Sequence, residues 1–456
     1  MPAEDVVTAL RAALPAEAVI TDRARIADFS HDQSQEPYSE DALVLVRARS
    51  TEDVSKTLAI ANETRTPVVA QGSRSGVTGS SNAIDGCIIL DLSGMRRIHV
   101  IDPLERIAVV DPGVLLEELQ HKVAAQGLFY PPDPGSVEIA SIGGSVATNA
   151  GGMRCIKYGV TRDSIRALEI VLADGSVVDT RARTAKDVSG LDITDLIIGS
   201  EGTLAVVTQV IVSLRPAPGP SLAVTATFPG IGEALEAANA VASGGRLPAT
   251  LELIDGLAIQ AIREHSPEVD LPGDAQAWLV AITDELIGAD EDLDRFEAAF
   301  RANGAITIQR SETPAETERL LRARRLLNPA TNAYRPGHLH SDAAVPRSVL
   351  PEFGVEILEY AVELGIEVSL SGHVGDGNLH PVVFFVPGQE AAAAKVLDRM
   401  LELAAEYGGT VTGEHGVGIE KLEAVRTLFP PRRLELQHAI KAAFDPNGIL
   451  NPGRKY

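Results

Sequence analysis

Residues 142–152 read IGGSVATNAGG, and residues 70–83 read AQGSRSGVTGSSNA directly after the strand-like PVV. Glycine, serine and threonine crowded at strand ends let backbone N–H groups and hydroxyls approach phosphate oxygens closely. A single stretch of this kind is more often a plain surface loop. Here a third stretch, GSEGTLAVVT at residues 199–208, adds to the first two. Together the three stretches predict a binding site for a diphosphate-containing cofactor.

The two common nucleotide-binding motifs are missing from the chain. No GxGxxG opens a helix after a strand, and no GxxxxGK is followed by serine or threonine. The sequence therefore argues against a Rossmann-type dehydrogenase and against a P-loop NTPase.

The composition indicates a globular and strongly acidic protein. The 456 residues are 45% hydrophobic and 23% charged, which suits two or three domains. The formal net charge of −23 repels phosphate backbones and anionic lipids, so we expect neither nucleic acid nor a membrane surface as a general partner. An anionic substrate must then be met by locally placed arginine, lysine, histidine or metal.

We expect a cytoplasmic protein with no integral membrane segment. The N-terminus lacks the basic and then apolar pattern of a signal peptide, and no apolar run reaches the length of about 18 residues that a spanning helix needs. The cysteines, Cys87 and Cys155, stand far apart and outside any CxxC pattern, so neither a disulfide framework nor a thiolate metal site is predicted.

Strand-like and helical patterns alternate along the whole chain. Clear helical patterns cover residues 51–65 and 115–127, between short β-branched runs. The segment PAPGPS at residues 216–221 breaks both periodicities and is the predicted linker. The alternation after it predicts an open α+β sheet with helices on one face.

A second group of motifs carries histidines. Residues 371–381 read SGHVGDGNLHP between the strand-like EVSLS and PVVFFV, and Asp-Gly is a strong hairpin signal. A turn at residues 375–378 would place His373 directly opposite His380, with Cβ atoms about 4.5–5.5 Å apart. Two imidazoles at that distance can bind one divalent cation, and Glu414 in the later stretch TVTGEHGVG is the candidate third ligand.

The motifs, in their order along the chain, are similar to those of a known family. PVVAQGSRSGVTGSS, PPDPGS, IGGSVATNAGG, KYGVTRDSI, GSEGTLAVVT and the closing NPG resemble the FAD-linked oxidases of the vanillyl-alcohol oxidase and p-cresol methylhydroxylase type. Over residues 36–456 the chain resembles the branch of glycolate oxidase, D-lactate dehydrogenase and D-2-hydroxyglutarate dehydrogenase.

The resemblance implies an α+β fold with two main parts. These are a two-part FAD-binding domain of the p-cresol methylhydroxylase type and an α+β substrate (cap) domain with an open antiparallel sheet. The expected parts are an N-terminal helix and connection at residues 1–36, the FAD-binding domain at 37–217, the substrate domain with the metal site at 218–420, and C-terminal helices packing back on the FAD domain at 421–456.

The resemblance also implies which residues bind FAD. The implied set is Gly72, Ser73, Arg74, Ser75, Gly76, Gly79, Ser80, Pro132, Asp133, Gly143, Gly144, Ala147, Asn149, Gly152, Glu201, Gly202, Val207 and Asn451. Some members of the superfamily attach FAD through a histidine in an RSGGH-like motif, where this chain reads RSGVT with Val77. We therefore expect non-covalent FAD.

For the chemistry, the resemblance implies a divalent metal, zinc being favoured, held by His373, His380 and Glu414, with His415 as the acid/base. A 2-hydroxy acid would bind the metal through its hydroxyl and one carboxylate oxygen. A metal lowers the pKa of a bound hydroxyl, which suits a histidine base with an unperturbed pKa of about 6.5. The Cα hydrogen would leave as hydride to flavin N5.

The resemblance further implies an arginine that holds the substrate carboxylate. Spacing to the segment DAAVPR selects Arg324, and its neighbours Arg322 and Arg325 are interpreted as solvated helix charges or ion-pair partners. The D-2-hydroxyglutarate enzymes carry a lysine and a threonine where this chain has His340 and Asn328. These two residues are the further substrate-binding candidates.

The favoured substrate is D-lactate or glycolate, because the chain reads His380-Pro381-Val382 where D-2-hydroxyglutarate enzymes read HLN. D-2-hydroxyglutarate dehydrogenase is the alternative. A non-redox alkylglycerone-phosphate synthase, a flavin-free metal hydrolase and a non-catalytic flavin-binding component of a larger oxidase rank lower. A quinone, a cytochrome or an electron-transfer flavoprotein would accept the electrons, and a homodimer is one of the assemblies left open.

Overall fold

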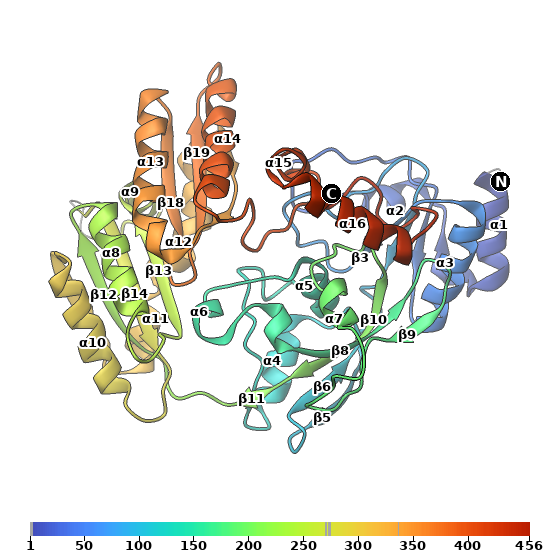
Figure 1. The fold of residues 1–456 in the computed structure, drawn as a ribbon, viewed down its shortest axis with the longest axis horizontal. Coiled ribbons are helices and arrows are strands. Elements are labelled where there is room, and N and C mark those ends of the chain that lie inside the picture. Colours follow the sequence, from blue (N-terminus) through green and yellow to red (C-terminus); the bar gives the residue numbers. More distant parts are fainter. Residues whose placement is uncertain (1–2, 270, 272–274, 336) are drawn as a thin grey trace. The chain divides into compact units, whose positions relative to one another are not determined.

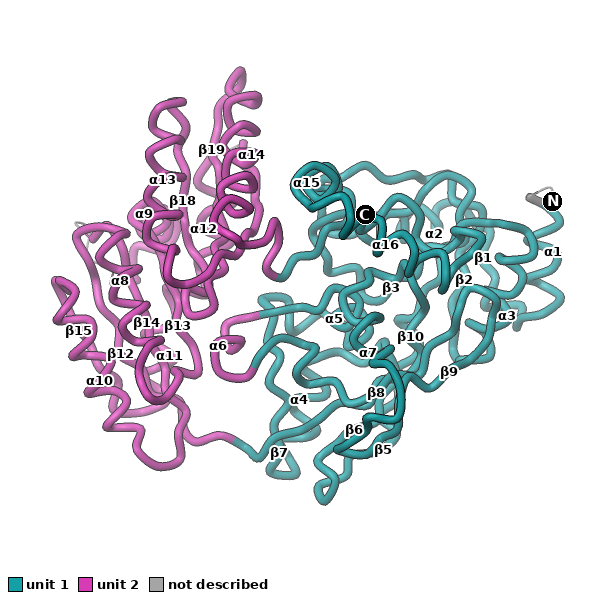
Figure 2. Tube along the Cα trace, in the orientation of Figure 1, with its two compact units in different colours: residues 1–151, 159–217, 414–456 teal, residues 152–158, 218–413 magenta. Residues whose placement is uncertain are grey.

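The computed structural model describes residues 3–269, 271, 275–335 and 337–456, and these form two compact units (Figure 2). Unit 1 comprises the chain up to Gly151, Gly159–Ala217 and Glu414–Tyr456, and unit 2 comprises Gly152–Tyr158 and Pro218–Gly413. The unit boundary at Ala217–Pro218 falls inside the predicted linker. The predicted substrate domain, residues 218–420, shares residues 218–413 with unit 2, whereas residues 414–420 group with unit 1.

The strands of unit 1 form separate sheets (Figure 1). One sheet has the order β1-β2-β4-β3, in which β2, β4 and β3 run parallel. A second, antiparallel sheet has the order β5-β6-β10-β8-β9, and β11 pairs with β7. The bounds are β1 Val19–Ile20, β2 Val44–Arg47, β3 Val68–Gln71, β4 Ile88–Asp91, β5 Ile98–Asp102, β6 Ile107–Val110, β7 Leu128–Phe129, β8 Ile165–Val171, β9 Val177–Asp179, β10 Val206–Ser213 and β11 Arg215–Pro216.

Helix α3 (Thr51–Thr64) of unit 1 packs an apolar stripe against residues of β2 and β4. It begins after Ser50, whose Oγ accepts a hydrogen bond from Asp53 N at 3.2 Å, and its Val54 and Leu58 are fully buried. The other bounds are α1 Ala3–Ala13, α2 Arg23–Ala27, α4 Leu116–Ala124, α5 Ile142–Thr148, α7 Ile193–Ile197, α15 Leu422–Leu428 and α16 Pro431–Phe444, with 3₁₀ turns at Ala16–Ala18 and Thr161–Ser164.

Unit 2 is built on one antiparallel sheet of order β15-β12-β14-β13-β18-β19-β16, with β17 also paired to β19. The strand bounds are β12 Leu222–Phe228, β13 Thr250–Asp255, β14 Ala277–Thr283, β15 Thr307–Arg310, β16 Gly337–His340, β17 Ala343–Ala344, β18 Glu367–His373 and β19 Asn378–Phe385. The helix bounds are α6 Cys155–Tyr158, α8 Ile231–Ala242, α9 Gly256–His265, α10 Ala289–Ala302, α11 Pro314–Leu320, α12 Arg322–Tyr334, α13 Leu350–Glu363 and α14 Glu390–Glu406, with a 3₁₀ turn at Arg347–Val349.

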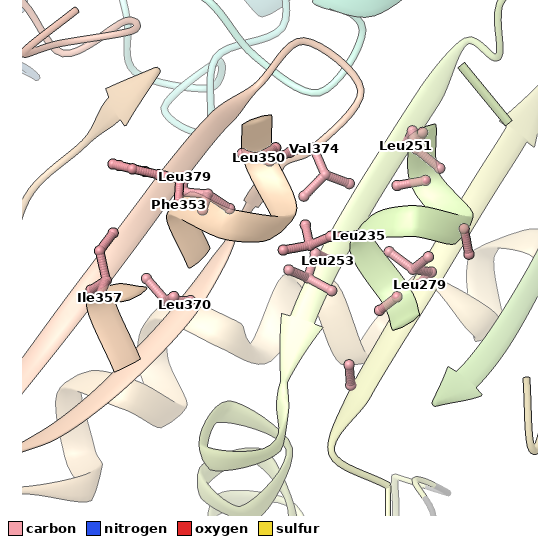
Figure 3. Close-up of a cluster of buried hydrophobic side chains, with 14 of the residues drawn as sticks. Leu235, Leu251, Leu253, Leu279, Leu350, Phe353, Ile357, Leu370, Val374 and Leu379 are labelled. Atoms are coloured by element: carbon pink, nitrogen blue, oxygen red, sulfur yellow. The ribbon is translucent and has the colours of Figure 1, made fainter. Parts of the chain in front are cut away.

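One face of this sheet carries the largest core of unit 2. Figure 3 shows Leu251 and Leu253 of β13 and Leu279 of β14 together with Leu235 of α8 and Phe353 of α13, and all five belong to one buried cluster. Helices α10 and α14 add to the same face, through members such as Phe296 and Met400 of that cluster.

The opposite face is covered as well, so the prediction of helices on one face is wrong. Ile254 of β13 and Trp278 of β14 pack against α9 and α12 in a second cluster with Ile259 and Leu327. Consecutive residues of β13 and β14 are buried throughout. The physical reason stands in the sequence, because runs such as AWLVAIT are apolar at successive positions and need cover on both faces.

The predicted hairpin at residues 371–381 exists, but its register differs from the prediction. His373 pairs with Asn378 and Ser371 pairs with His380, so the turn spans residues 374–377. The reason is a pairing of the turn residues with distant backbone, because Gly375 N donates to Leu251 O at 3.3 Å and Val345 N donates to Gly377 O at 3.1 Å. That pairing is non-local and cannot be read from the hairpin itself.

Candidate active site

The two glycine-rich stretches meet in unit 1. Ser141 N donates to Ser73 Oγ at 3.1 Å, and Ser73 N donates to Ser141 Oγ at 3.3 Å. A Cβ at Gly72 would lie 2.4 Å from Ser141 Oγ, so a side chain there would displace this hydroxyl. Residues 142–148 form helix α5 rather than a loop, and Ser141 is its N-cap, accepting from Gly144 N at 3.3 Å.

Several buried side-chain oxygens around the first stretch have no hydrogen-bond partner among the described residues. They are Asp32 Oδ2, Gln71 Oε1, Thr78 Oγ1 and Asn451 Oδ1. Buried polar groups are normally paired, so these oxygens fit a ligand that presents donors such as sugar or ribityl hydroxyls. Together with the Cβ-free backbone at Gly72 they suit FAD. Sequence reasoning missed Asp32, which lies far upstream of the motif and within no pattern.

The C-terminal tail holds the backbone of the first stretch. Asn451 Nδ2 donates to Ser80 O at 2.9 Å and to Glu201 O at 2.7 Å. Arg454, which sequence reasoning also missed, is buried and donates from Nε to Gly79 O at 3.0 Å. The predicted cofactor residue Asn451 thus ties the loop after β3 to the turn at Glu201.

The side chain of Glu201, predicted to contact FAD, is fully buried and supports a loop. Its two carboxylate oxygens accept from Val417 N and Gly418 N, each at 2.8 Å, and Lys455 Nζ lies 3.1 Å from Oε1. Because Val417 follows the predicted base His415 by two residues, Glu201 holds the loop that carries this base. Its predicted FAD contact stays a prediction.

The other predicted cofactor residues also lie in unit 1, except Gly152, the first residue of the short unit 2 segment. Their roles stay predictions. Val77, at the place of a flavin-linking histidine, is 42% exposed. In unit 1, Arg74, Ser75, Gly76, Gly79 and Ser80 follow β3; Pro132 and Asp133 follow β7; Gly143, Gly144 and Ala147 lie in α5 and Asn149 ends it with φ 54°; Gly202 lies in the turn before β10, and Val207 lies in β10.

His373, His380 and Glu414 form a candidate metal centre. One possible ligand atom from each lies within 4.8 Å of the others. The two imidazole centroids are 4.9 Å apart and their planes meet at 83°. His373 is buried, and His380 and Glu414 are half-buried. Two imidazoles and one carboxylate form a donor set that zinc accepts, with a further position left for water or substrate. The residues therefore fit a divalent metal.

A buried carboxylate anchors the chain directly before Glu414. Asp342, which is fully buried, accepts from Gly413 N at 2.6 Å and from Thr412 Oγ1 at 3.1 Å. A Cβ at Gly151 would lie 2.5 Å from Glu414 Oε2, so a side chain at the end of the second glycine-rich stretch would displace the Glu414 carboxylate. Asp342 was missed because nothing in its sequence neighbourhood marks it as a contact of residue 413.

A second buried carboxylate links the candidate metal centre to the predicted substrate arginine. Glu252 Oε1 lies 2.6 Å from His373 Nδ1, and Arg324 Nε donates to Glu252 Oε2 at 2.8 Å. Burial acts to raise the pKa of the Glu252 carboxyl, but the charges of His373 and Arg324 outweigh it and hold that pKa below its usual range. Sequence reasoning did not single out Glu252, because LELID reads as an ordinary strand.

The arginines of α12 differ as the sequence predicts. Arg322 and Arg325 are 56% and 64% exposed and pair with Glu268 and Glu318 on the surface. Arg324 is 15% exposed. Of these three arginines, Arg324 is therefore the one whose guanidinium points into unit 2.

The two remaining substrate candidates lie on α12 and β16. Asn328 is exposed, one helical turn beyond Arg324. His340 Nε2 lies 2.9 Å from the amide Oδ1 of Asn332, one further turn along α12. Arg324, Asn328 and Asn332 thus follow one side of this helix at intervals of four residues.

Within the described part of the chain, no helix has both the length and the apolar character needed to cross a bilayer.

Comparisons with known proteins agree with the family resemblance drawn from the sequence. Residues 42–181 match the family described as FAD binding domain, and residues 218–454 match FAD linked oxidases, C-terminal domain. The glycolate oxidase subunit GlcD of Bacillus subtilis is 35% identical over 94% of this chain and 92% of that protein. The D-lactate dehydrogenase of Archaeoglobus fulgidus is 34% identical over 92% of each chain.

Solved structures agree on the fold. A substrate-bound p-cresol methylhydroxylase superposes with a TM-score of 0.78 at 18% identity, covering 99% of this chain and 96% of that one. An alkyldihydroxyacetonephosphate synthase superposes with a TM-score of 0.75 at 16% identity, covering 98% and 84%. The predicted α+β fold of the p-cresol methylhydroxylase type is confirmed, and the protein belongs to the family of FAD-linked oxidases.

Proposed function

We propose that the protein is a FAD-dependent dehydrogenase that oxidises a D-2-hydroxy acid, with D-lactate and glycolate favoured, to the 2-oxo acid. The observation that carries this proposal is the joint placement of a metal-type donor set and an arginine on one buried carboxylate, Glu252. Relatives named glycolate oxidase subunit GlcD and D-lactate dehydrogenase support the substrate class.

Two bound groups complete the proposed site. The first group is non-covalent FAD, which the loops around Gly72 and Asn451 suit. The second is a divalent metal, zinc being favoured, which His373, His380 and Glu414 suit. The chemistry that these groups supply when bound is hydride acceptance at flavin N5 and acidification of the substrate hydroxyl.

The chain's own residues then position the substrate and move one proton. Arg324 binds the substrate carboxylate, which allows a protein of net charge −23 to accept an anion. A ring nitrogen of His415 takes the hydroxyl proton. The Cα–H bond breaks with both electrons leaving as hydride, and the C–O bond becomes a carbonyl, so the substrate loses one proton and one hydride.

The reduced cofactor must pass its electrons on. We propose a quinone, a cytochrome or an electron-transfer flavoprotein as the acceptor class, and a cytoplasmic location and a homodimer stay predictions. Because Val77 stands where a covalent attachment would need histidine, acid precipitation is expected to release the flavin into the supernatant. Flavin that stays with the pellet would contradict non-covalent binding.

D-2-hydroxyglutarate is the alternative substrate, and one observation favours it. The polar pair of His340 and Asn332 lies on the same side of α12 as Arg324, where a second carboxylate could be met. The likeness to an alkyldihydroxyacetonephosphate synthase, at 16% identity, shows the shared fold alone. It is no support for a reaction without net oxidation or reduction.

The test is anaerobic bleaching of the flavin by D-lactate, L-lactate, glycolate, D-2-hydroxyglutarate and D-malate. We expect rapid bleaching by D-lactate or glycolate, and His415→Ala should keep its FAD but lose this reduction. Treatment with EDTA should lower the rate, and readdition of Zn²⁺ should restore it. Bleaching by an L-isomer alone would contradict the stereochemistry, and near wild-type reduction in His415→Ala would contradict the role of the base.

A further inference from the structure

Glu252 stands at the centre of a buried triad within unit 2. Its side chain is 0% exposed, and its partners come from two other elements, His373 from β18 and Arg324 from α12. Each carboxylate oxygen has its own partner, at 2.6 Å and 2.8 Å. A carboxylate buried to this extent is costly unless it is paired, so the triad holds all three side chains in one arrangement.

The contact at His373 determines which ring nitrogen can bind a metal. A carboxylate can only accept, so the nitrogen facing Glu252, Nδ1, must carry the proton. When the ring is neutral and binds a metal, the lone pair then lies on Nε2, at the far side of the ring. Metal-binding histidines commonly donate their other N–H to a carboxylate, which fixes the tautomer and the orientation of the ring.

The contact at Arg324 determines how its guanidinium is presented. The Nε–H is used by Glu252, and the terminal Nη groups remain as a planar fork. Such a fork matches the two oxygens of a carboxylate. The same carboxylate that orients the metal ligand therefore also orients the proposed substrate clamp.

We propose that Glu252 is a positioning residue that couples metal affinity to the binding of the substrate carboxylate. It does so by fixing both the tautomer of His373 and the direction of the Arg324 guanidinium. This inference rests on the proposed function. The triad needs an acid and not an amide at residue 252. Both partners present N–H donors, and a glutamine has only one oxygen with which to accept.

The main test is Glu252→Gln, assayed for metal binding without any substrate. Flavin-loaded, metal-free protein is titrated with Zn²⁺ in competition with a chromogenic chelator. We expect an affinity about 10–100-fold weaker than that of the wild type, the range found when a metal ligand loses its carboxylate partner. With Zn²⁺ at saturation, KM for D-lactate should rise about tenfold or more while kcat changes less, because Arg324 is no longer directed at the carboxylate.

Asp255→Asn is the matched control. Asp255 is a buried carboxylate on the same strand, but its Oδ1 accepts from Ala258 N at 3.0 Å and Ser369 Oγ at 2.7 Å, contacts that form no part of the triad. This variant should bind Zn²⁺ and D-lactate as the wild type does. FAD content, measured for both variants, reports on the fold of unit 1 independently.

A measurement on the wild type keeps the inference testable if Glu252→Gln fails to fold. In metal-free protein labelled with ¹⁵N-histidine, long-range ¹H–¹⁵N spectra should show a proton on Nδ1 of the His373 ring, with the signal assigned by its loss in His373→Asn. A His373 ring whose Nδ1 carries no proton would overturn the inference.

The outcomes separate the inference from the function on which it rests. If the wild type binds Zn²⁺ and its flavin is reduced by a hydroxy acid, and Glu252→Gln shows the same Zn²⁺ affinity and the same reduction, only the role of Glu252 is contradicted. A wild type that neither binds Zn²⁺ nor is reduced by any acid of the panel contradicts the proposed function itself.

Discussion

At the scale of single residues, the predicted contact between His373 and His380 is present although the predicted register of their hairpin is wrong. The sequence predicts His373 directly opposite His380, whereas His373 faces Asn378 and the histidines are diagonal neighbours. The shift is by two positions on one strand, and side chains two apart lie on the same face of a strand. Diagonal neighbours are still within reach of long or aromatic side chains, so the ring centroids lie 4.9 Å apart.

The turn between these histidines depends on Gly377. Its φ is +89°, and a Cβ there would lie 2.1 Å from Val345 O. Gly388 has a φ of +97° and no atom within 4 Å of its Cβ position. Gly388→Ala should therefore cost about 1 kcal/mol from backbone strain alone, and Gly377→Ala about 1–3 kcal/mol more because the turn must move.

Urea unfolding of the two variants measures this difference. Gly377→Ala should also bind Zn²⁺ more weakly, because the displaced turn carries His373 and His380 on its two sides, whereas Gly388→Ala should bind it normally. Equal stability of the two variants would show that the hairpin tolerates a displaced turn.

At the scale of secondary structure elements, buried carboxylates tie the elements of each unit together. Glu201 joins the turn before β10 to the loop after His415, and Asp342 joins the chain near β17 to Gly413. Asp255 is the N-cap of α9 and also accepts from Ser369 of β18. Apart from the N-cap of α9, these contacts join segments far apart in the sequence, which explains why no local pattern revealed them.

Asp255 gives unit 2 a pH dependence that can be measured. Burial raises the pKa of its carboxyl from 3.8 to about 6. The folded state then binds more protons than the unfolded state between these values, so this group's contribution to stability is fully present below pH 3.8 and is lost as pH rises through about 6. A shift of this size corresponds to about 3 kcal/mol.

Asp255→Asn removes this ionisation. The free energy of unfolding of the variant, relative to that of the wild type, should therefore rise between pH 4 and pH 7, by up to about 3 kcal/mol. Denaturant unfolding at a series of pH values measures the difference. A difference that stays constant with pH would mean that the Asp255 carboxyl titrates alike in the folded and unfolded states.

At the scale of the whole molecule, the acidic surface opposes the proposed substrate. The net charge is −23, and the substrate is an anion, so long-range repulsion should slow its arrival while Arg324 acts only at close range. Raising NaCl from about 10 mM to about 150 mM shortens the Debye length from about 30 Å to about 8 Å. We expect kcat/KM for D-lactate to rise over this range.

Steady-state kinetics at several salt concentrations measure this effect, with sucrose of equal osmolality as the control for changes unrelated to charge. A fall of kcat/KM with salt would mean that the local positive charge at the site outweighs the surface charge.

The sequence by itself determined the family and the cofactor class, and it predicted the residues of the candidate metal centre. Glycine-rich stretches and closely spaced histidines are local patterns, because a glycine is needed wherever two backbones approach closely and because ligands often lie a few residues apart. For the same reason the hairpin was predicted. The distinction between Arg324 and the exposed Arg322 and Arg325 came instead from the family resemblance.

Only the tertiary structure decided the register of that hairpin, the cover on both faces of the unit 2 sheet and the partners of the functional side chains. Backbone of Leu251 and Val345, outside the hairpin, bonds the turn residues Gly375 and Gly377. The carboxylates of Glu252 and Asp342 lie 121 and 71 residues from His373 and Gly413, the groups they hold. Their contacts arise when distant strands pair, because a buried charge must find its partner wherever packing brings one. No local pattern records that requirement.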